Sequence, residues 1–155
     1  MVASMILLLF LSIPGQSMDS LRNIEDCQVI CQQALQYYSE NQDPQLIYEL
    51  VENHWYRQEE VVPTLDMLEE LLDDNAFIIS EFGDIIPGEF EFLGELNLGS
   101  YQTTLVYLIK YQYGLYPCSF RFYKPKQYYL LNGMQFGSSA VEMMEKFYQV
   151  NITVN

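Results

Sequence analysis

Positively charged residues are scarce in this chain. The sequence of 155 residues holds 7 Lys and Arg against 21 Asp and Glu, which gives a formal net charge of −14. A protein that binds nucleic acid needs clustered positive charge to neutralise phosphates, and an anionic membrane surface makes the same demand. The composition therefore disfavours both as partners. An acidic surface ordinarily serves solubility, and the alternative is an inhibitor that binds a basic protein.

Histidine and cysteine are scarce as well. His54 is the one histidine, and the cysteines are Cys27, Cys31 and Cys118. An odd number leaves at least one cysteine unpaired, so the chain has no disulfide framework. Cys27 and Cys31 are four residues apart, on one face of a helix and near the outer limit of disulfide reach. Zinc ligation would need thiolates joined by histidine, so we expect no metal, no cofactor and three buried cysteines.

The chain also lacks an apolar run long enough to span a bilayer, which takes about 20 residues. Residues 1–17 carry no charge, and Met5 to Ile13 form an apolar core broken by one serine. Small residues follow at Gly15 and Ser17, which predicts a signal peptide cleaved after Ser17 and an exported (periplasmic or secreted) domain over 18–155. No Lys or Arg precedes the apolar run. A true start at Met18, which would leave the protein in the cytoplasm, is the alternative.

Apolar residues at spacings of three and four predict three helices in the N-terminal half. The first begins after Asp19 and ends near Gln42, and the third begins near Pro63. The second begins at Asp43 as N-cap, with Pro44 at the first helical position. The predicted buried stripe of the first helix contains Leu21, Ile24, Cys27, Ile30 or Cys31, Ala34, Leu35 and Tyr38. The polar face of the third helix carries Asp66, Glu69, Glu70, Asp73 and Asp74.

From Gly83 the pattern changes to a period of two, which predicts strands near 89–98, 101–113, 118–123 and 128–136. Gly94 would mark a bulge in the first strand. Both sides of strand 101–113 are apolar in the middle. This predicts that the centre of the strand is buried on both faces of the sheet, by helices on one face and by a lid, pocket or partner on the other. Turns are expected at 113–117 and 124–126, and a short closing helix after Ser138. The buried side of that helix would contain Val141, Met144 or Met143, Phe147 and Tyr148. The chain is therefore expected to be α+β, with three N-terminal helices on an antiparallel sheet of about four strands.

The strand block reads YLIKYQYGLYPCSFRFYKPKQYYLLNGMQF. It resembles the strands of small exported bacterial proteins with an NTF2-like (cystatin-like, SnoaL-like) fold, in which a Tyr-Leu-x-Lys-Tyr-like phrase precedes a Phe-x-Phe-Tyr-Lys-Pro strand. The resemblance covers roughly residues 83–137 and extends to Trp55 before the third helix. It implies a curved sheet wrapped around long helices, a cone that holds a small ligand, and a homodimer through the sheet face. Enzymes of this fold place an Asp, a His–Asp pair or a Tyr–Asp pair in the cone, and these strands carry no Asp beyond Phe92.

Five residues are candidates for ligand binding, namely His54, Trp55, Tyr107, Arg121 and Tyr123. His54 could act as a base near pH 7 if a carboxylate oriented it, and the alternative is a helix-terminal histidine that covers an apolar edge. Arg121 could bind a carboxylate if its face lines the cone, and the alternative is a salt link to the acidic helices or a solvated strand residue. No catalytic residue is assigned.

Three functions remain open. The first is a non-enzymatic binding module for a small apolar ligand or a protein partner, favoured by the two-sided apolar centre of strand 101–113 and the many aromatic residues. The second is an acidic inhibitor or immunity-type protein that binds a basic partner. The third is an NTF2-like isomerase, dehydratase or hydrolase, which needs a titratable pair within about 3 Å inside a cavity.

Overall fold

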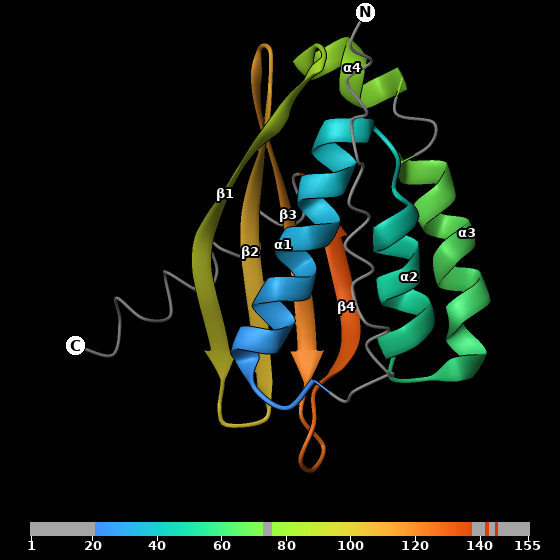
Figure 1. Cartoon of the computed structure of the whole chain (residues 1–155), viewed down its shortest axis with the longest axis vertical. Helices are drawn as coiled ribbons and strands as arrows, with labels where there is room; N and C mark the ends of the chain where they lie inside the picture. The colour runs from blue at the N-terminus through green and yellow to red at the C-terminus, as the bar shows by residue number, and fades with distance from the viewer. Residues whose placement is uncertain (1–20, 73–75, 138–141, 143–144, 146–155) are drawn as a thin grey trace, which may run out of the picture.

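The computed structural model describes residues 21–72, 76–137, 142 and 145, and it has the α+β architecture that the pattern predicts (Figure 1). The helices are α1 (Ile24–Asn41), α2 (Gln45–His54), the 3-10 turn η1 (Gln58–Glu60), α3 (Val61–Leu72) and α4 (Ala76–Phe82). The strands are β1 (Ile85–Leu98), β2 (Gln102–Tyr111), β3 (Gly114–Tyr123) and β4 (Leu130–Phe136). They form one antiparallel sheet in the order β1-β2-β3-β4. Helix α1 packs on β1 and β2, α2 packs beside α1, and α3 packs against α2.

Helix α1 begins with a reciprocal cap. The Asp26 N–H donates to Asn23 Oδ1 at 2.8 Å, and the Asn23 N–H donates to Asp26 Oδ2 at 3.3 Å. The predicted buried stripe is confirmed from Cys27 to Tyr38. Leu21 was expected to be helical and is not, because the Asn23 cap starts the helix after it. Leu21 instead forms an isolated bridge with Tyr129, whose N–H donates to the Leu21 carbonyl at 2.6 Å.

The next three helices differ from the expectation in their bounds and number. Helix α2 starts at Gln45, one residue later than predicted, and the Gln45 N–H donates to Asp43 Oδ1 at 2.9 Å. Helix α3 starts at Val61, which places Pro63 in the first turn, where a missing N–H costs nothing. Helix α4 was not predicted, because seven residues are too few to show a helical period. It ends at Phe82, and Gly83, the next residue, has a φ of +76°.

The sheet contains the predicted bulge, and the bulge overturns the expectation that Phe92 and Leu96 share one face of the first strand. Phe92 pairs with Tyr107 and Gly94 with Val106, so Leu93 is the extra residue of a bulge beside Gly94. Leu96 pairs with Thr104, which faces away from Tyr107, so the alternation reverses at the bulge. Cys118, Phe120 and Phe122 are fully buried on the helix side of β3. Val106 and Ser119 are also buried, on the opposite side, which confirms that the sheet centre is covered on both faces. Leu98, expected to be buried, is 68% exposed because it lies at the last position of β1.

The connection between β2 and β3 is tighter than expected. Tyr111 pairs with Gly114, so the turn consists of Gln112 and Tyr113, and the prediction of a turn over 113–117 was wrong. Pro117 lies inside β3, where its carbonyl accepts a hydrogen bond from the Gly137 N–H at 2.8 Å. The N and O atoms of one strand residue point to the same side. The nitrogen of Pro117, which carries no hydrogen, therefore points toward the end of β4 and away from β2. The hydrogen bonds between β2 and β3 are not affected by the proline.

The expected signal peptide and most of the expected closing helix lie outside the described residues. Glu142 and Glu145, the two described residues of the closing segment, are helical and exposed. Among the described helices, none combines the length and the apolar character needed to cross a bilayer.

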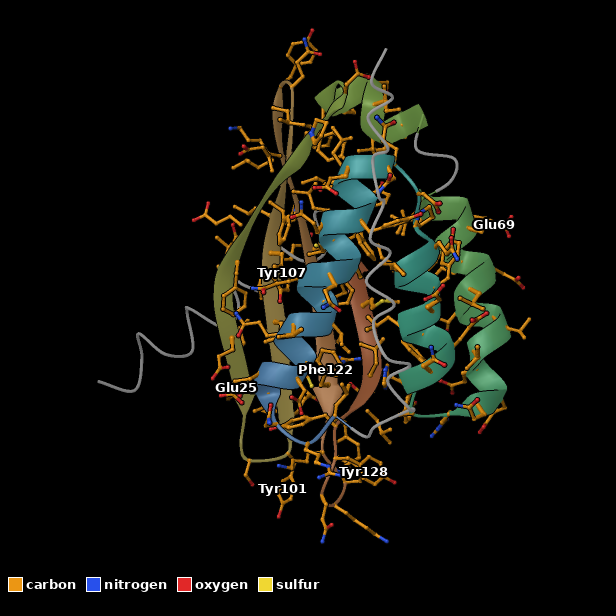
Figure 2. All side chains as sticks on the ribbon, in the orientation of Figure 1. Glu25, Glu69, Tyr101, Tyr107, Phe122 and Tyr128 are labelled. Carbon is orange, nitrogen blue, oxygen red and sulfur yellow. The ribbon has the colours of Figure 1, made fainter. Side chains whose placement is uncertain are left out.

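The core lies between α1 and the inner faces of β2 and β3. Tyr107, Phe120 and Phe122 are its largest fully buried side chains, and Figure 2 shows Tyr107 and Phe122 between α1 and the strands. Helix α1 contributes small side chains opposite these rings, Cys27, Cys31 and Ala34, which let the helix axis approach the sheet. The three thiols are free and buried, as expected.

Tyr107 has a buried hydroxyl that finds no hydrogen-bond partner. We expect Tyr107→Phe to raise the free energy of unfolding by up to about 1 kcal/mol, because the folded protein dehydrates this hydroxyl without satisfying it. Urea unfolding at equilibrium measures the change. Tyr128→Phe is the control, since Tyr128 is 40% exposed and its loss should change stability by less than about 0.5 kcal/mol. A Tyr107→Phe variant that loses 1 kcal/mol or more would contradict the expectation.

Burial also controls the cysteine chemistry. Burial, followed by the charge of Asp26, raises the pKa of Cys27 from 9.0 to about 12, and burial raises the pKa of Cys31 and of Cys118. Because these pKa values are higher in the folded state, the unfolded chain loses thiol protons first as the pH rises above about 9. The cysteines therefore stabilise the fold below pH 9 and lose that contribution at higher pH.

We expect the three thiols to react with iodoacetamide at pH 8.5 at least a hundredfold more slowly in the native protein than in urea, because only thiolates react. Mass spectrometry after timed quenching measures each cysteine. Equal rates with and without urea would show that the thiols are accessible in the native fold.

Candidate functional site

His54 and Trp55, two of the predicted site residues, lie where α2 ends against β4. His54 is the last residue of α2 and is partly buried, which lowers the pKa of its imidazole. The Trp55 N–H donates to the Val51 carbonyl at 3.0 Å, and Trp55 forms a bridge with Leu131. The indole Nε1 of Trp55 is buried without a partner. These contacts make the pair part of the junction between a helix and the sheet.

Tyr107 belongs to the core. Its ring centroid lies 5.1 Å from that of Phe92, 6.0 Å from Phe120 and 6.4 Å from Phe90. The side chain is 0% exposed and therefore has no surface to offer a ligand.

Arg121 and Tyr123 lie on the opposite side of the sheet from Tyr107, because alternate residues of β3 face opposite sides. The exposed Arg121 donates from Nη2 to the Asn132 carbonyl at 3.2 Å. Asn132 is the extra residue of a bulge between β3 and β4. The Arg121 side chain therefore donates a hydrogen bond to the irregular backbone of that bulge. Tyr123 is 38% exposed at the end of β3. The five predicted residues therefore do not meet in one site.

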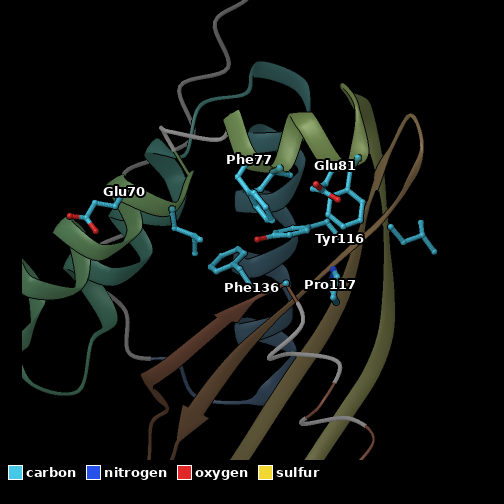
Figure 3. Close-up of a pocket in the computed structure, with 11 residues that line it drawn as sticks. Glu70, Phe77, Glu81, Tyr116, Pro117 and Phe136 are labelled. Atoms are coloured by element: carbon cyan, nitrogen blue, oxygen red, sulfur yellow. The ribbon is translucent and has the colours of Figure 1, made fainter.

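The structure instead shows a pocket at the end of the sheet, which sequence reasoning missed (Figure 3). Its volume is about 590 Å³, and it lies between the C-terminal turn of α3, helix α4, the start of β3 and the end of β4. Its apolar wall contains Leu71, Phe77, Ile78, Phe82, Tyr116 and Phe136. Two carboxylates, Glu70 and Glu81, also line it.

The pocket forms because the strands have unequal lengths. Cys118 pairs with Phe136 at the end of β4, so residues 114–116 of β3 extend beyond the β4 ladder. Helix α4 covers this extension, with the Phe82 ring edge-on to Tyr116 at 5.6 Å between centroids. A Cβ at Gly114 would approach the Phe82 ring to 2.8 Å, so glycine permits this contact.

Phe77 and Tyr116 give the pocket its binding character. Phe77 is 71% exposed, which is unusual for a phenylalanine beside an apolar cavity. Tyr116 is 6% exposed, and burial raises the pKa of its phenol, which therefore remains protonated at neutral pH. Figure 3 shows Phe77, Tyr116 and Phe136 directed toward a common space, with the Tyr116 hydroxyl between the two phenylalanines.

The signal that could have located Phe77 was the run AFIISEF, in which apolar residues occupy more than one side of a helix. Ile78 of this run is buried while Phe77 is exposed. A short helix with surplus apolar residues has a face that the core does not use.

A second depression, of about 460 Å³, is more open and lies over α1. It is lined by Gln32, Gln33, Gln36, Tyr37, Glu40, Leu46 and Phe90. His54 lines neither this depression nor the end pocket. In the described part of the chain, no three His, Cys, Asp or Glu side chains are grouped so as to hold a metal ion.

No family model matches the chain, and the searches of curated proteins and of solved structures found no significant match either.

Proposed function

We propose that this chain is a non-enzymatic, exported binding protein of the NTF2-like type, and that it holds a small apolar ligand in the end pocket. The observation that carries the proposal is the pocket of about 590 Å³ with an exposed phenylalanine on its wall. This volume lies within the range of small-molecule sites, which are mostly apolar with a few placed polar groups. Helices followed by a four-stranded antiparallel sheet are compatible with an NTF2-like cone.

The centre of the sheet is not the site in this proposal. Tyr107, Phe120 and Phe122 are fully buried there and fill the space between α1 and the strands. A ligand would have to displace several aromatic rings from a packed core. The end pocket needs no such displacement.

The enzymatic alternative lacks a supporting arrangement in the described residues. General acid–base catalysis needs a titratable group within hydrogen-bond reach of a bound substrate. His54, the strongest sequence candidate for this role, lines neither depression.

We expect Phe77→Ala to weaken binding of the neutral fluorescent probe N-phenyl-1-naphthylamine by roughly tenfold to a hundredfold, because burying a Phe side chain contributes about 1.5–3 kcal/mol. Fluorescence titration measures the dissociation constant. The stability of the variant should change little, since Phe77 is already exposed. Val62→Ala is the matched control, because Val62 is 66% exposed on the neighbouring helix α3 and does not line the pocket. Equal affinities of the two variants would contradict the proposal.

A second candidate function, the acidic inhibitor of a basic partner, is favoured by a row of carboxylates on the edge strand β1. Glu89, Glu91 and Glu95 are exposed along it, and Glu95 lies on the opposite face from the other two because of the bulge at Leu93. Lys110 is the cation that pairs with this row in the described chain, with its Nζ 3.6 Å from Glu89 Oε2. Helix α3 carries further acids, and Figure 1 shows it on the opposite flank of the molecule from β1.

If β1 binds a basic partner, a lysine-rich peptide should shift the amide NMR signals of β1 more than those of α3 at low salt. Glu89→Gln/Glu91→Gln/Glu95→Gln should remove that preference, because the row would lose its three charges. Asp66→Asn/Glu69→Gln/Glu70→Gln on α3 is the control with the same change of net charge. Shifts spread evenly over both elements would instead indicate a general effect of the −14 charge.

A further inference from the structure

The charged side chains among the described residues of the end pocket are all of one sign. Glu70 and Glu81 line it, and no Lys, Arg or His is among the described residues of its wall. Within the described chain the ion pairs are Arg57–Glu60 and Lys110–Glu89, so no described residue forms an ion pair with Glu70 or Glu81.

The two helices beside the pocket add to this negative potential. Glu70 and Leu71 belong to the last turn of α3, and Glu81 and Phe82 belong to the last turn of α4. The C-terminal turn of a helix carries a partial negative charge from its unpaired carbonyls. Neither helix has a basic residue in its last turn to offset it.

We propose that the ligand of this pocket is an organic cation, with an aromatic or alkyl body and one ammonium group. The body would lie among Phe77, Tyr116 and Phe136, and the ammonium would face Glu81 and Glu70. The proposal rests on the proposed function, since it assigns a ligand class to the same pocket. Aromatic faces attract cations, so the wall and the rim favour the same ligand.

The competing ligand classes fit less well. A carboxylate would meet two like charges and the negative ends of two helices, and Tyr116 carries the one side-chain hydroxyl among the described lining residues. A neutral ligand would use the apolar wall and leave the carboxylates without a role.

Three probes with one naphthalene body test the charge preference by calorimetric titration of the full chain: 1-naphthylmethylammonium, 1-naphthylmethanol and 1-naphthylacetate. We expect the cation to bind about tenfold more tightly than the alcohol at low salt, with the carboxylate weakest. The advantage of the cation should shrink at 0.5 M NaCl, because salt screens exposed charges at ~5 Å or beyond.

Two variants test whether the preference for the cation comes from the two pocket carboxylates. Glu70→Gln/Glu81→Gln should bring the affinity for the cation down to that for the alcohol and leave the alcohol unchanged. Glu69→Gln/Asp84→Asn is the control, because it makes the same change of net charge with two exposed acids outside the pocket wall. Figure 2 shows Glu69 on the outer side of α3. This control should keep the preference for the cation.

Each outcome decides one question. Equal binding of the cation and the alcohol would overturn the charge preference and leave the proposed binding function standing. Failure of both the cation and the alcohol to bind would overturn the proposed function itself. If the two variants lost the preference for the cation equally, the overall charge of the protein would explain that preference. This result would overturn its assignment to Glu70 and Glu81.

Discussion

The structure depends on one contact, the packing of small residues of α1 against large aromatic residues of the sheet. Cys27, Cys31 and Ala34 lie opposite a face that includes Tyr107 and Phe120. Truncating a fully buried aromatic side chain costs about 3–5 kcal/mol, a large part of the stability of a domain of this size. Helix α2 packs beside α1 and also touches β4, α3 packs against α2, and α4 packs directly on β3.

That packed centre also decides where a ligand can bind. Rings occupy the middle of the sheet, while the β2–β3 hairpin continues past the last residue of β4. Helix α4 closes over this extension and leaves space between its Phe77 and the Tyr116 of β3. The pocket is therefore a consequence of strand length and of one short helix, and its inner wall, with Ile78, Tyr116 and Phe136, belongs to the hydrophobic core. Changes to its exposed side chains, Phe77, Glu70 and Glu81, should alter binding with little effect on folding.

Electrostatics gives the pocket its selectivity in our proposal. The net charge of −14 gives the molecule a field that attracts cations in general. Two carboxylates and two helix C-termini concentrate that field beside an aromatic wall. The buried thiols contribute nothing to this site, because burial raises their pKa values and keeps them protonated.

The sequence by itself determined the fold class, the stripe of α1 and the alternation of β3, because a periodic pattern of apolar residues reports which side of an element is buried. It misplaced the turn before Pro117, since only the length of β4 decides whether a proline fits at that position. It also named five site residues that lie apart, because alternation places Tyr107 and Arg121 on opposite sides of the sheet. The pocket joins α3, α4, β3 and β4 from residues 70 to 137, and its existence was decided by tertiary structure alone. No local pattern records how far one strand extends beyond its neighbour or which helix covers the gap.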